Sequence, residues 1–126
     1  MPIPDHILNA EYVSLATFRK NGDAVPTPIW AAPFEGKLYA FSAGNAGKVK
    51  RLRNFSRAQL APCTSSGKLL GVWQEASAYL VDDPAEVELA NQALKAKYGW
   101  KMTLTDLASK LAGRYTKRVI VRMEMP

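Results

Sequence analysis

A glycine-bearing turn that runs into a basic helical pattern is the part of this sequence best suited to chemistry. It spans residues 42–54 and reads SAGNAGKVKRLRN. Gly44 and Gly47 let the backbone come close to a ligand, and the free N–H groups of a helix's first turn point outward. Lys48 adds a full positive charge at the same end. Together these groups predict an anion site of the kind that holds a phosphate.

The elements that must position this turn are predicted to be strands. Residues 12–18 alternate β-branched and aromatic residues with small ones, and Asn21-Gly22 is a strong hairpin turn signal. We therefore expect residues 12–18 to pair antiparallel with residues 25–30. Pro26 and Pro28 face the same side of that second strand and donate no backbone hydrogen bond. One edge of the strand should therefore stay open to a ligand, while the other edge pairs.

Four further strands complete the predicted sheet. They are expected at residues 38–42, 58–63, 72–81 and 118–124, with turns at 34–37 and 64–68. This pattern predicts a mainly β fold with flanking helices, organised as a six-stranded antiparallel barrel.

Two helices are predicted in addition to the basic helix, which we expect to run from Lys48 to Arg57. The longer one begins at Pro84 with Asp83 as its N-cap and Glu86 reaching back in a capping box, and it ends at Gly99. A short second helix is expected at residues 104–111. Neither helix contains a recognisable catalytic motif.

The length and the net charge of the chain limit the classes of protein to which it can belong. The 126 residues predict one domain over 1–126, and 17 basic against 11 acidic residues give a net charge of +6, which favours anionic ligands. No apolar run is long enough for a membrane helix, and the N-terminus lacks a signal peptide pattern, so we expect a cytoplasmic protein without a membrane partner. The single cysteine, Cys63, is predicted to be a buried structural residue.

Several kinds of catalytic site are not expected. His6 is the only histidine, so neither a histidine-based triad nor a multi-histidine metal site is predicted, and we expect no bound metal. The acidic residues at 82–88 are interpreted as a helix start, and no nucleotide-binding glycine motif is present. An enzyme with so few acid–base groups would take its chemistry from a cofactor.

The chain resembles the flavin-binding split β-barrel superfamily that includes pyridoxamine 5′-phosphate oxidase, and within it the branch of deazaflavin (F420)-dependent oxidoreductases. The resemblance extends from about residue 12 to residue 125 and is carried by residues 17–23, 25–30, 37–42, 47–53 and 58–63. It implies a split barrel that forms a homodimer and binds F420 or FMN. It also implies hydride transfer between that cofactor and a small organic substrate.

The same resemblance implies roles for individual residues. Ser42 and Lys48 match the positions that hold the cofactor phosphate, but Gly47 stands where the family often has an arginine, so that Lys50, Arg51 or Arg53 would compensate. Surplus basic charge would also suit the acidic tail of F420. The full set of residues expected to bind the cofactor is Pro26, Thr27, Pro28, Ile29, Trp30, Ser42, Gly47, Lys48, Arg51, Arg53 and Trp73.

The strand of residues 26–31 matches the family segment that lines the cofactor ring. Thr27 stands where phosphate-oxidase members carry a phosphate-binding arginine, which argues against a vitamin B6 oxidase. Trp30 is interpreted as a wall of the ring pocket, with a packed core aromatic as the alternative. Trp73 would complete the pocket from the partner subunit, or would only pack at the dimer interface.

Two other functions remain open at the level of sequence. The basic helix could make phosphate contacts in a nucleic-acid-binding module, although no recognition motif is visible and we expect no nucleic-acid partner. A cofactor carrier with the same fold and no turnover is the second alternative.

Overall fold

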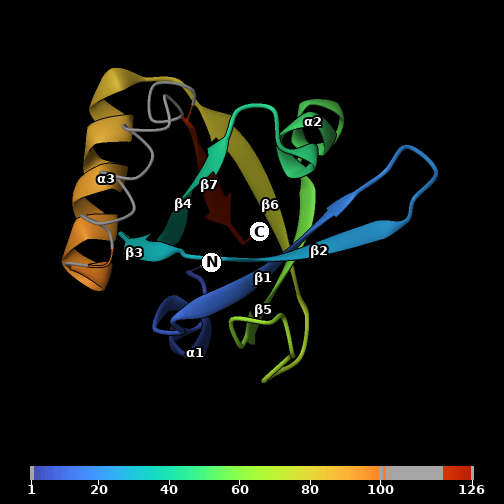
Figure 1. Cartoon of the computed structure of the whole chain (residues 1–126), viewed down its shortest axis with the longest axis horizontal. Coiled ribbons are helices and arrows are strands. Elements are labelled where there is room, and N and C mark those ends of the chain that lie inside the picture. The colour runs from blue at the N-terminus through green and yellow to red at the C-terminus, as the bar shows by residue number, and fades with distance from the viewer. Residues whose placement is uncertain (1, 100, 102–117, 126) are drawn as a thin grey trace.

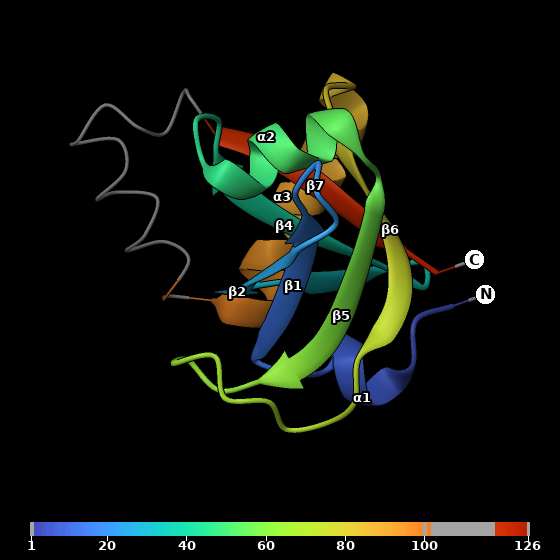
Figure 2. The same cartoon turned by 90° about the vertical axis from the view of Figure 1, so that its right-hand side faces the viewer.

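A computed structural model describes residues 2–99, 101 and 118–125. Its centre is one curled antiparallel sheet of seven strands that forms a half-barrel, with the order β2-β1-β5-β6-β7-β4-β3 (Figures 1 and 2). The strands are β1 (Tyr12–Phe18), β2 (Ala24–Ile29), β3 (Ala32–Phe34), β4 (Lys37–Ala43), β5 (Arg57–Cys63), β6 (Gln74–Val81) and β7 (Arg118–Glu124). The helices are α1 (Asp5–Leu8), α2 (Gly47–Asn54) and α3 (Pro84–Tyr98).

The predicted first hairpin is confirmed. β1 pairs with β2 antiparallel, and Gly22 takes a positive φ of 93° in the turn between them. β2 is the last strand on its side of the sheet, with Pro26 opposite Ala16 and Pro28 opposite Ser14. An edge position is where a strand tolerates proline, because a missing donor there breaks no ladder bond.

The predicted number of six strands is wrong, because β3 is a seventh. β3 pairs with β4 across a tight turn in which Glu35 and Gly36 both have positive φ values, 52° and 79°. This is the backbone pattern of a two-residue hairpin turn. With three residues, one of them Pro33, β3 is too short to show an alternating pattern in the sequence.

The N-terminal segment closes one end of the curled sheet. Ile3 and Ile7 belong to the main hydrophobic core, at 2% and 0% exposure, together with Leu15, Leu60 and Met123. α1 lies at this end, whereas α2 lies at the opposite end (Figures 1 and 2). Burial of these large apolar side chains contributes on the order of 1.5–3 kcal/mol each.

The basic helix is shorter than predicted. α2 ends at Asn54 because Arg57 already begins β5, and Val49 and Leu52 on its inner face are buried. The predicted strand at 72–81 likewise begins later, at Gln74. The positions of the other predicted strands are confirmed to within a residue or two.

α3 packs against β3 and β4 on one side of the sheet (Figure 1). Its predicted N-cap is confirmed, because the Asp83 carboxylate accepts from the Glu86 backbone N–H at 3.1 Å, and the helix ends at Gly99 with a φ of 56°. The predicted capping box is wrong: the Glu86 carboxylate instead accepts from Arg122 at 2.8 and 2.9 Å and from the Tyr39 hydroxyl at 2.7 Å. The helix predicted at 104–111 lies outside the described residues.

Candidate functional site

A cavity of about 300 Å³ opens where β2, β4 and α2 meet. It lies at the end of the sheet that carries α2, opposite α1. Its lining residues are Pro28, Ile29, Trp30, Phe41, Ser42, Ala43, Ala46 and Lys48. Five of these eight residues, Pro28, Ile29, Trp30, Ser42 and Lys48, are ones that the sequence predicted to bind a cofactor.

The first turn of α2 offers backbone donors to this cavity. Its N-cap is Ala46, which has no side chain able to cap the helix, and the Ala46 carbonyl accepts from the N–H groups of Val49 and Lys50. Within the described residues, the N–H groups of Gly47 and Lys48 have no hydrogen-bond acceptor. These donors and the positive end of the helix dipole together favour an anion at this point.

Lys48 places a cation beside those donors without a compensating carboxylate. Its side chain forms no ion pair with any acidic group in the described part of the chain. Burial lowers the pKa of Lys48, and the nearby positive charge of Arg51 lowers it further. Because a bound anion would relieve both effects, the site is electrostatically suited to a phosphate.

Arg51 lies folded back towards the start of its own helix. Its Nε donates to the hydroxyl of Thr17 on β1 at 2.6 Å, and a Cβ built on Gly47 would lie 2.9 Å from its Nη1. The guanidinium therefore occupies the space beside Gly47 that a side chain would fill. Partial burial and the charge of Arg19 lower the pKa of Arg51. The charge of Arg51 in turn reinforces the positive potential around Lys48.

Ser42 contributes a buried hydroxyl at the end of β4. It is 4% exposed, and its Oγ donates to the carbonyl of Ala43 at a long distance of 3.3 Å. A bond of this length is weak, so the hydroxyl can turn towards a ligand in the cavity at little cost.

Trp30 is both a wall of the cavity and a packed aromatic. Its indole stacks on Tyr98 of α3 with a centroid distance of 4.7 Å and an interplanar angle of 12°, and Tyr12 lies at 6.5 Å in a tilted arrangement. The two interpretations left open by the sequence are therefore compatible, because Trp30 packs on Tyr98 and also lines the cavity.

Phe41 is a lining residue that the sequence analysis did not single out. It lies on β4 next to Ser42, and the guanidinium of Arg118 on β7 lies 4.1 Å from its ring centroid. Arg122, on the same strand, pairs with Glu86 and Glu124. Strand alternation predicts only which face Phe41 occupies, and the pairing of β4 with β7 brings it to Arg118.

Six predicted residues do not line this cavity in the single chain. Pro26 and Arg53 are exposed, and Thr27 lies opposite Leu15 in the β1–β2 ladder. Trp73 is half-buried in the segment that precedes β6. Gly47 and Arg51 lie next to the lining residues without forming the wall themselves.

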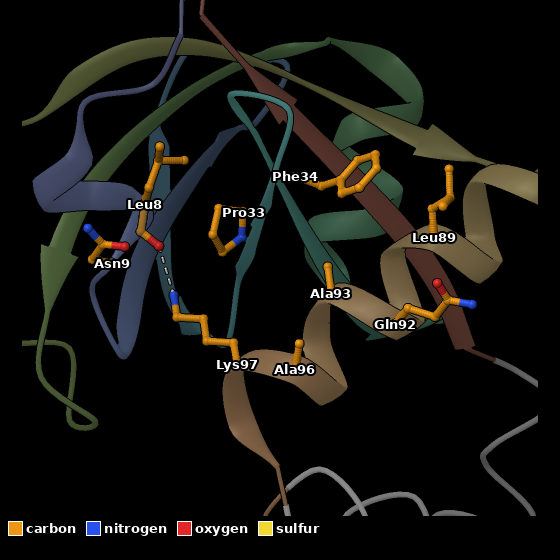
Figure 3. A pocket seen from close by; sticks show the side chains of 9 residues that line it. All are labelled: Leu8, Asn9, Pro33, Phe34, Leu89, Gln92, Ala93, Ala96 and Lys97. Carbon is orange, nitrogen blue, oxygen red and sulfur yellow. Dashed lines mark hydrogen bonds between the residues drawn. The ribbon is translucent and has the colours of Figure 1, made fainter.

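A larger cavity of about 540 Å³ lies elsewhere, between α1, β3 and α3 (Figure 3). Most of the residues that line it are apolar. Lys97 is the one cation among these lining residues, and its ammonium group is already hydrogen-bonded. Burial lowers the pKa of Lys97 to about 8, and the Lys97 Nζ donates to the carbonyls of Leu8, Ala10 and Ala31. This cavity therefore offers no unsatisfied positive group to a phosphate, and the smaller one is the better candidate.

The described residues contain no cluster of three or more histidine, cysteine or acidic groups that could hold a metal ion. None of the helices in the described ranges combines the length and apolar character needed to cross a membrane.

Comparison with known proteins supports the fold. No protein-family model matches the chain, and no curated protein matches it. Several solved structures match the chain. The hypothetical protein Rv2991 of Mycobacterium tuberculosis is 19% identical with a TM-score of 0.66, over 94% of this chain and 74% of that one. The heme storage protein HutZ of Vibrio cholerae is 11% identical with a TM-score of 0.69, over 100% and 92%.

An F420 reductase is a third similar structure, at 15% identity and a TM-score of 0.61, over 97% of this chain and 94% of that one. Identities this low show a common fold and leave the ligand of this chain to be argued from its own residues. The described residues thus share the fold of these proteins, in which a curled antiparallel sheet forms a half-barrel.

Proposed function

We propose that the protein is an oxidoreductase that binds a flavin-type cofactor, FMN or F420, and transfers a hydride between it and a small organic substrate. The observation that carries this proposal is that the start of α2, whose Lys48 pairs with no carboxylate among the described residues, borders a cavity that the Trp30 indole also lines. Lys48 and Trp30 line the same cavity, although 18 positions separate them in the sequence.

The residues present fit the phosphate of such a cofactor. The N–H groups of Gly47 and Lys48, the Lys48 ammonium and the Arg51 guanidinium would hold the phosphate. Pro28, Ile29 and Trp30 would provide the apolar surface for the ring. When bound, the cofactor supplies the hydride chemistry; the side chains of this protein bind it, orient it and exclude water from it.

We further propose that the protein acts as a homodimer. A cavity of about 300 Å³ is at the lower limit for a cofactor site, so that one chain encloses such a ligand incompletely. The segment between β5 and β6 borders this region, since a Cβ built on Gly67 would lie 3.9 Å from the Pro28 ring. Leu70 and Val72 in the same segment are 65% and 69% exposed, which favours burial by a second copy.

Titration with FMN and separately with F420, followed by cofactor fluorescence, tests the proposal. We expect one of them to bind below millimolar concentration, and Lys48→Ala to weaken binding roughly tenfold or more, because a charge-assisted contact to phosphate is lost. Lys50→Ala is the matched control, because Lys50 is exposed on the same helix outside the cavity.

Binding of DNA or RNA with a steep salt dependence, and of neither cofactor, would instead identify a nucleic-acid-binding module. Cofactor binding without reduction of any nitro, quinone or enone compound tested would point to a carrier. A substrate-dependent change of the cofactor's absorbance at catalytic protein concentrations supports the enzyme.

A further inference from the structure

The short link between β2 and β3 is held by side chains of α3. Ala31 lies in this link, is completely buried, and forms no strand pair. Its N–H donates to the Tyr98 hydroxyl at 2.9 Å, and its carbonyl accepts from the Lys97 Nζ at 2.6 Å. Two neighbouring residues at the end of one helix therefore satisfy both backbone groups of the residue that follows Trp30.

Tyr98 holds this segment with its hydroxyl as well as with its ring. Besides accepting from Ala31, the hydroxyl donates its one proton to the Glu11 carbonyl at 2.7 Å, with the Ala31 carbonyl as a second acceptor at 3.0 Å. The ring stacks on the Trp30 indole at 4.7 Å. Tyr98 is 7% exposed, so loss of the hydroxyl would leave a buried N–H without an acceptor.

Lys97 connects the same link to the N-terminal segment. An ammonium group has three protons, and all three are matched here by carbonyl oxygens, those of Leu8 at 3.0 Å, Ala10 at 2.6 Å and Ala31 at 2.6 Å. The dashed line in Figure 3 marks the contact to Leu8. A neutral side chain of similar length would leave the carbonyls of Leu8 and Ala10 without a donor among the described residues, and the Ala31 carbonyl with the Tyr98 hydroxyl alone.

We propose that Lys97 and Tyr98 are positioning residues that fix the Trp30 indole as a wall of the cavity at α2. Neither residue lines that cavity. The part of this inference that concerns the cofactor rests on the proposed function, whereas the placement of Trp30 can be tested without any ligand.

Fluorescence of the cofactor-free protein provides that test. In a Trp73→Phe, Trp100→Phe background, Trp30 is the only tryptophan. We expect Tyr98→Phe, which retains the ring and loses the hydroxyl, to shift the Trp30 emission to longer wavelength and to increase its quenching by acrylamide. Tyr79→Phe is the matched control, because Tyr79 lies on β6 away from Trp30.

The second variant, Lys97→Met, replaces the Lys97 ammonium group with an uncharged side chain. Lys97→Met should change the Trp30 emission in the same direction, while Lys95→Met, an exposed lysine on the same helix, should not. If Lys97→Met fails to fold, Tyr98→Phe decides the question. Folded Tyr98→Phe protein whose Trp30 emission and quenching equal those of the parent would overturn the proposal.

Cofactor titration of Tyr98→Phe and Lys97→Met, made in the parent chain that keeps Trp73, extends the test to the site. We expect Tyr98→Phe to weaken the binding of FMN or F420 roughly five- to tenfold, since misplacement of a wall residue reduces the fit of the ring. If the parent protein binds neither cofactor, the proposed function fails, and the fluorescence of Trp30 still decides whether Lys97 and Tyr98 position it. A parent that binds and a folded variant that binds equally well would overturn the positioning role.

Discussion

The Nε of Arg51 donates to the hydroxyl of Thr17 at 2.6 Å, which connects the basic helix to β1, the strand next to the edge strand β2. Thr17 is completely buried, so the hydroxyl has a fixed position. The bond turns the guanidinium towards the first turn of α2, where Lys48 lines the cavity. The sheet thus determines where the positive charge of Arg51 lies.

Thr17→Val should reduce the affinity for FMN or F420 several-fold and lower the free energy of unfolding by about 1 kcal/mol. Valine has nearly the shape of threonine but cannot accept a hydrogen bond, so Arg51 loses its orientation. Isothermal titration calorimetry and urea unfolding measure the two effects. In an Arg51→Met background, Thr17→Val should have little further effect on affinity, and an equally large loss there would disprove the coupling.

Gly47→Ala should weaken cofactor binding without lowering the free energy of unfolding. The φ of Gly47 is not positive, so alanine fits the helix, and stability should be unchanged or higher by less than about 1 kcal/mol. The new Cβ would lie 2.9 Å from Nη1 of Arg51 and displace the guanidinium. We therefore expect weaker cofactor binding with an unchanged or higher melting temperature. Unchanged affinity would show that Arg51 does not contact the cofactor.

The ion pair of Glu86 and Arg122 should make stability depend on pH at the acidic end. Hydrogen bonds from Arg122, and secondly from Tyr39, lower the pKa of Glu86 below its ordinary value of 4.5. Its stabilising effect is therefore complete above pH 4.5 and is lost as the pH falls through the lower pKa of the folded state. Glu86→Gln should be about 1–2 kcal/mol less stable at pH 7 and should lose less stability on acidification.

Urea unfolding between pH 3 and pH 7 measures this difference. Glu88→Gln is the control, because Glu88 is exposed on the same helix and contacts only Gln92 among the described residues. Parallel stability curves for the wild type and Glu86→Gln would contradict the prediction.

Leu70→Glu should convert the proposed homodimer into monomers. Leu70 is 65% exposed, and a charge placed in an interface costs several kcal/mol when it is desolvated. Sedimentation velocity measures the change, and Leu89→Glu serves as the control, because Leu89 is 41% exposed on α3 and lines the larger cavity, away from the segment that contains Leu70. Cofactor affinity should fall together with dimerisation if the second copy completes the site. A wild type that sediments as a monomer at all concentrations would disprove the dimer.

Local signals were enough to predict most of the elements. The turn at Asn21-Gly22, the cap at Asp83 and the end at Gly99 depend on backbone preferences of a few adjacent residues, and all three are confirmed. β3 was missed because three residues carry no periodicity. The capping box was wrong because Arg122, 36 positions away, competes for the Glu86 carboxylate.

In the candidate site too, features formed by neighbouring residues were predictable, and contacts between distant residues were not. A turn followed by a helix was enough to predict an anion site at Lys48, whereas the role of Ser42 was implied by the family resemblance. The contacts of Arg51 with Thr17 and of Trp30 with Tyr98 join residues 34 and 68 positions apart, and no local pattern predicts such pairs.

Steric preference and charge within a few adjacent residues were enough to predict most of the strands, the cap at Asp83 and an anion site at the start of α2. The folded structure was needed to show that Trp30 and Lys48 line one cavity, that Arg51 takes the space beside Gly47, and that Lys97 and Tyr98 hold the link that follows Trp30. Those outcomes follow from the pairing order of the sheet and from the burial of polar groups that must find partners, and both are properties of the whole folded chain.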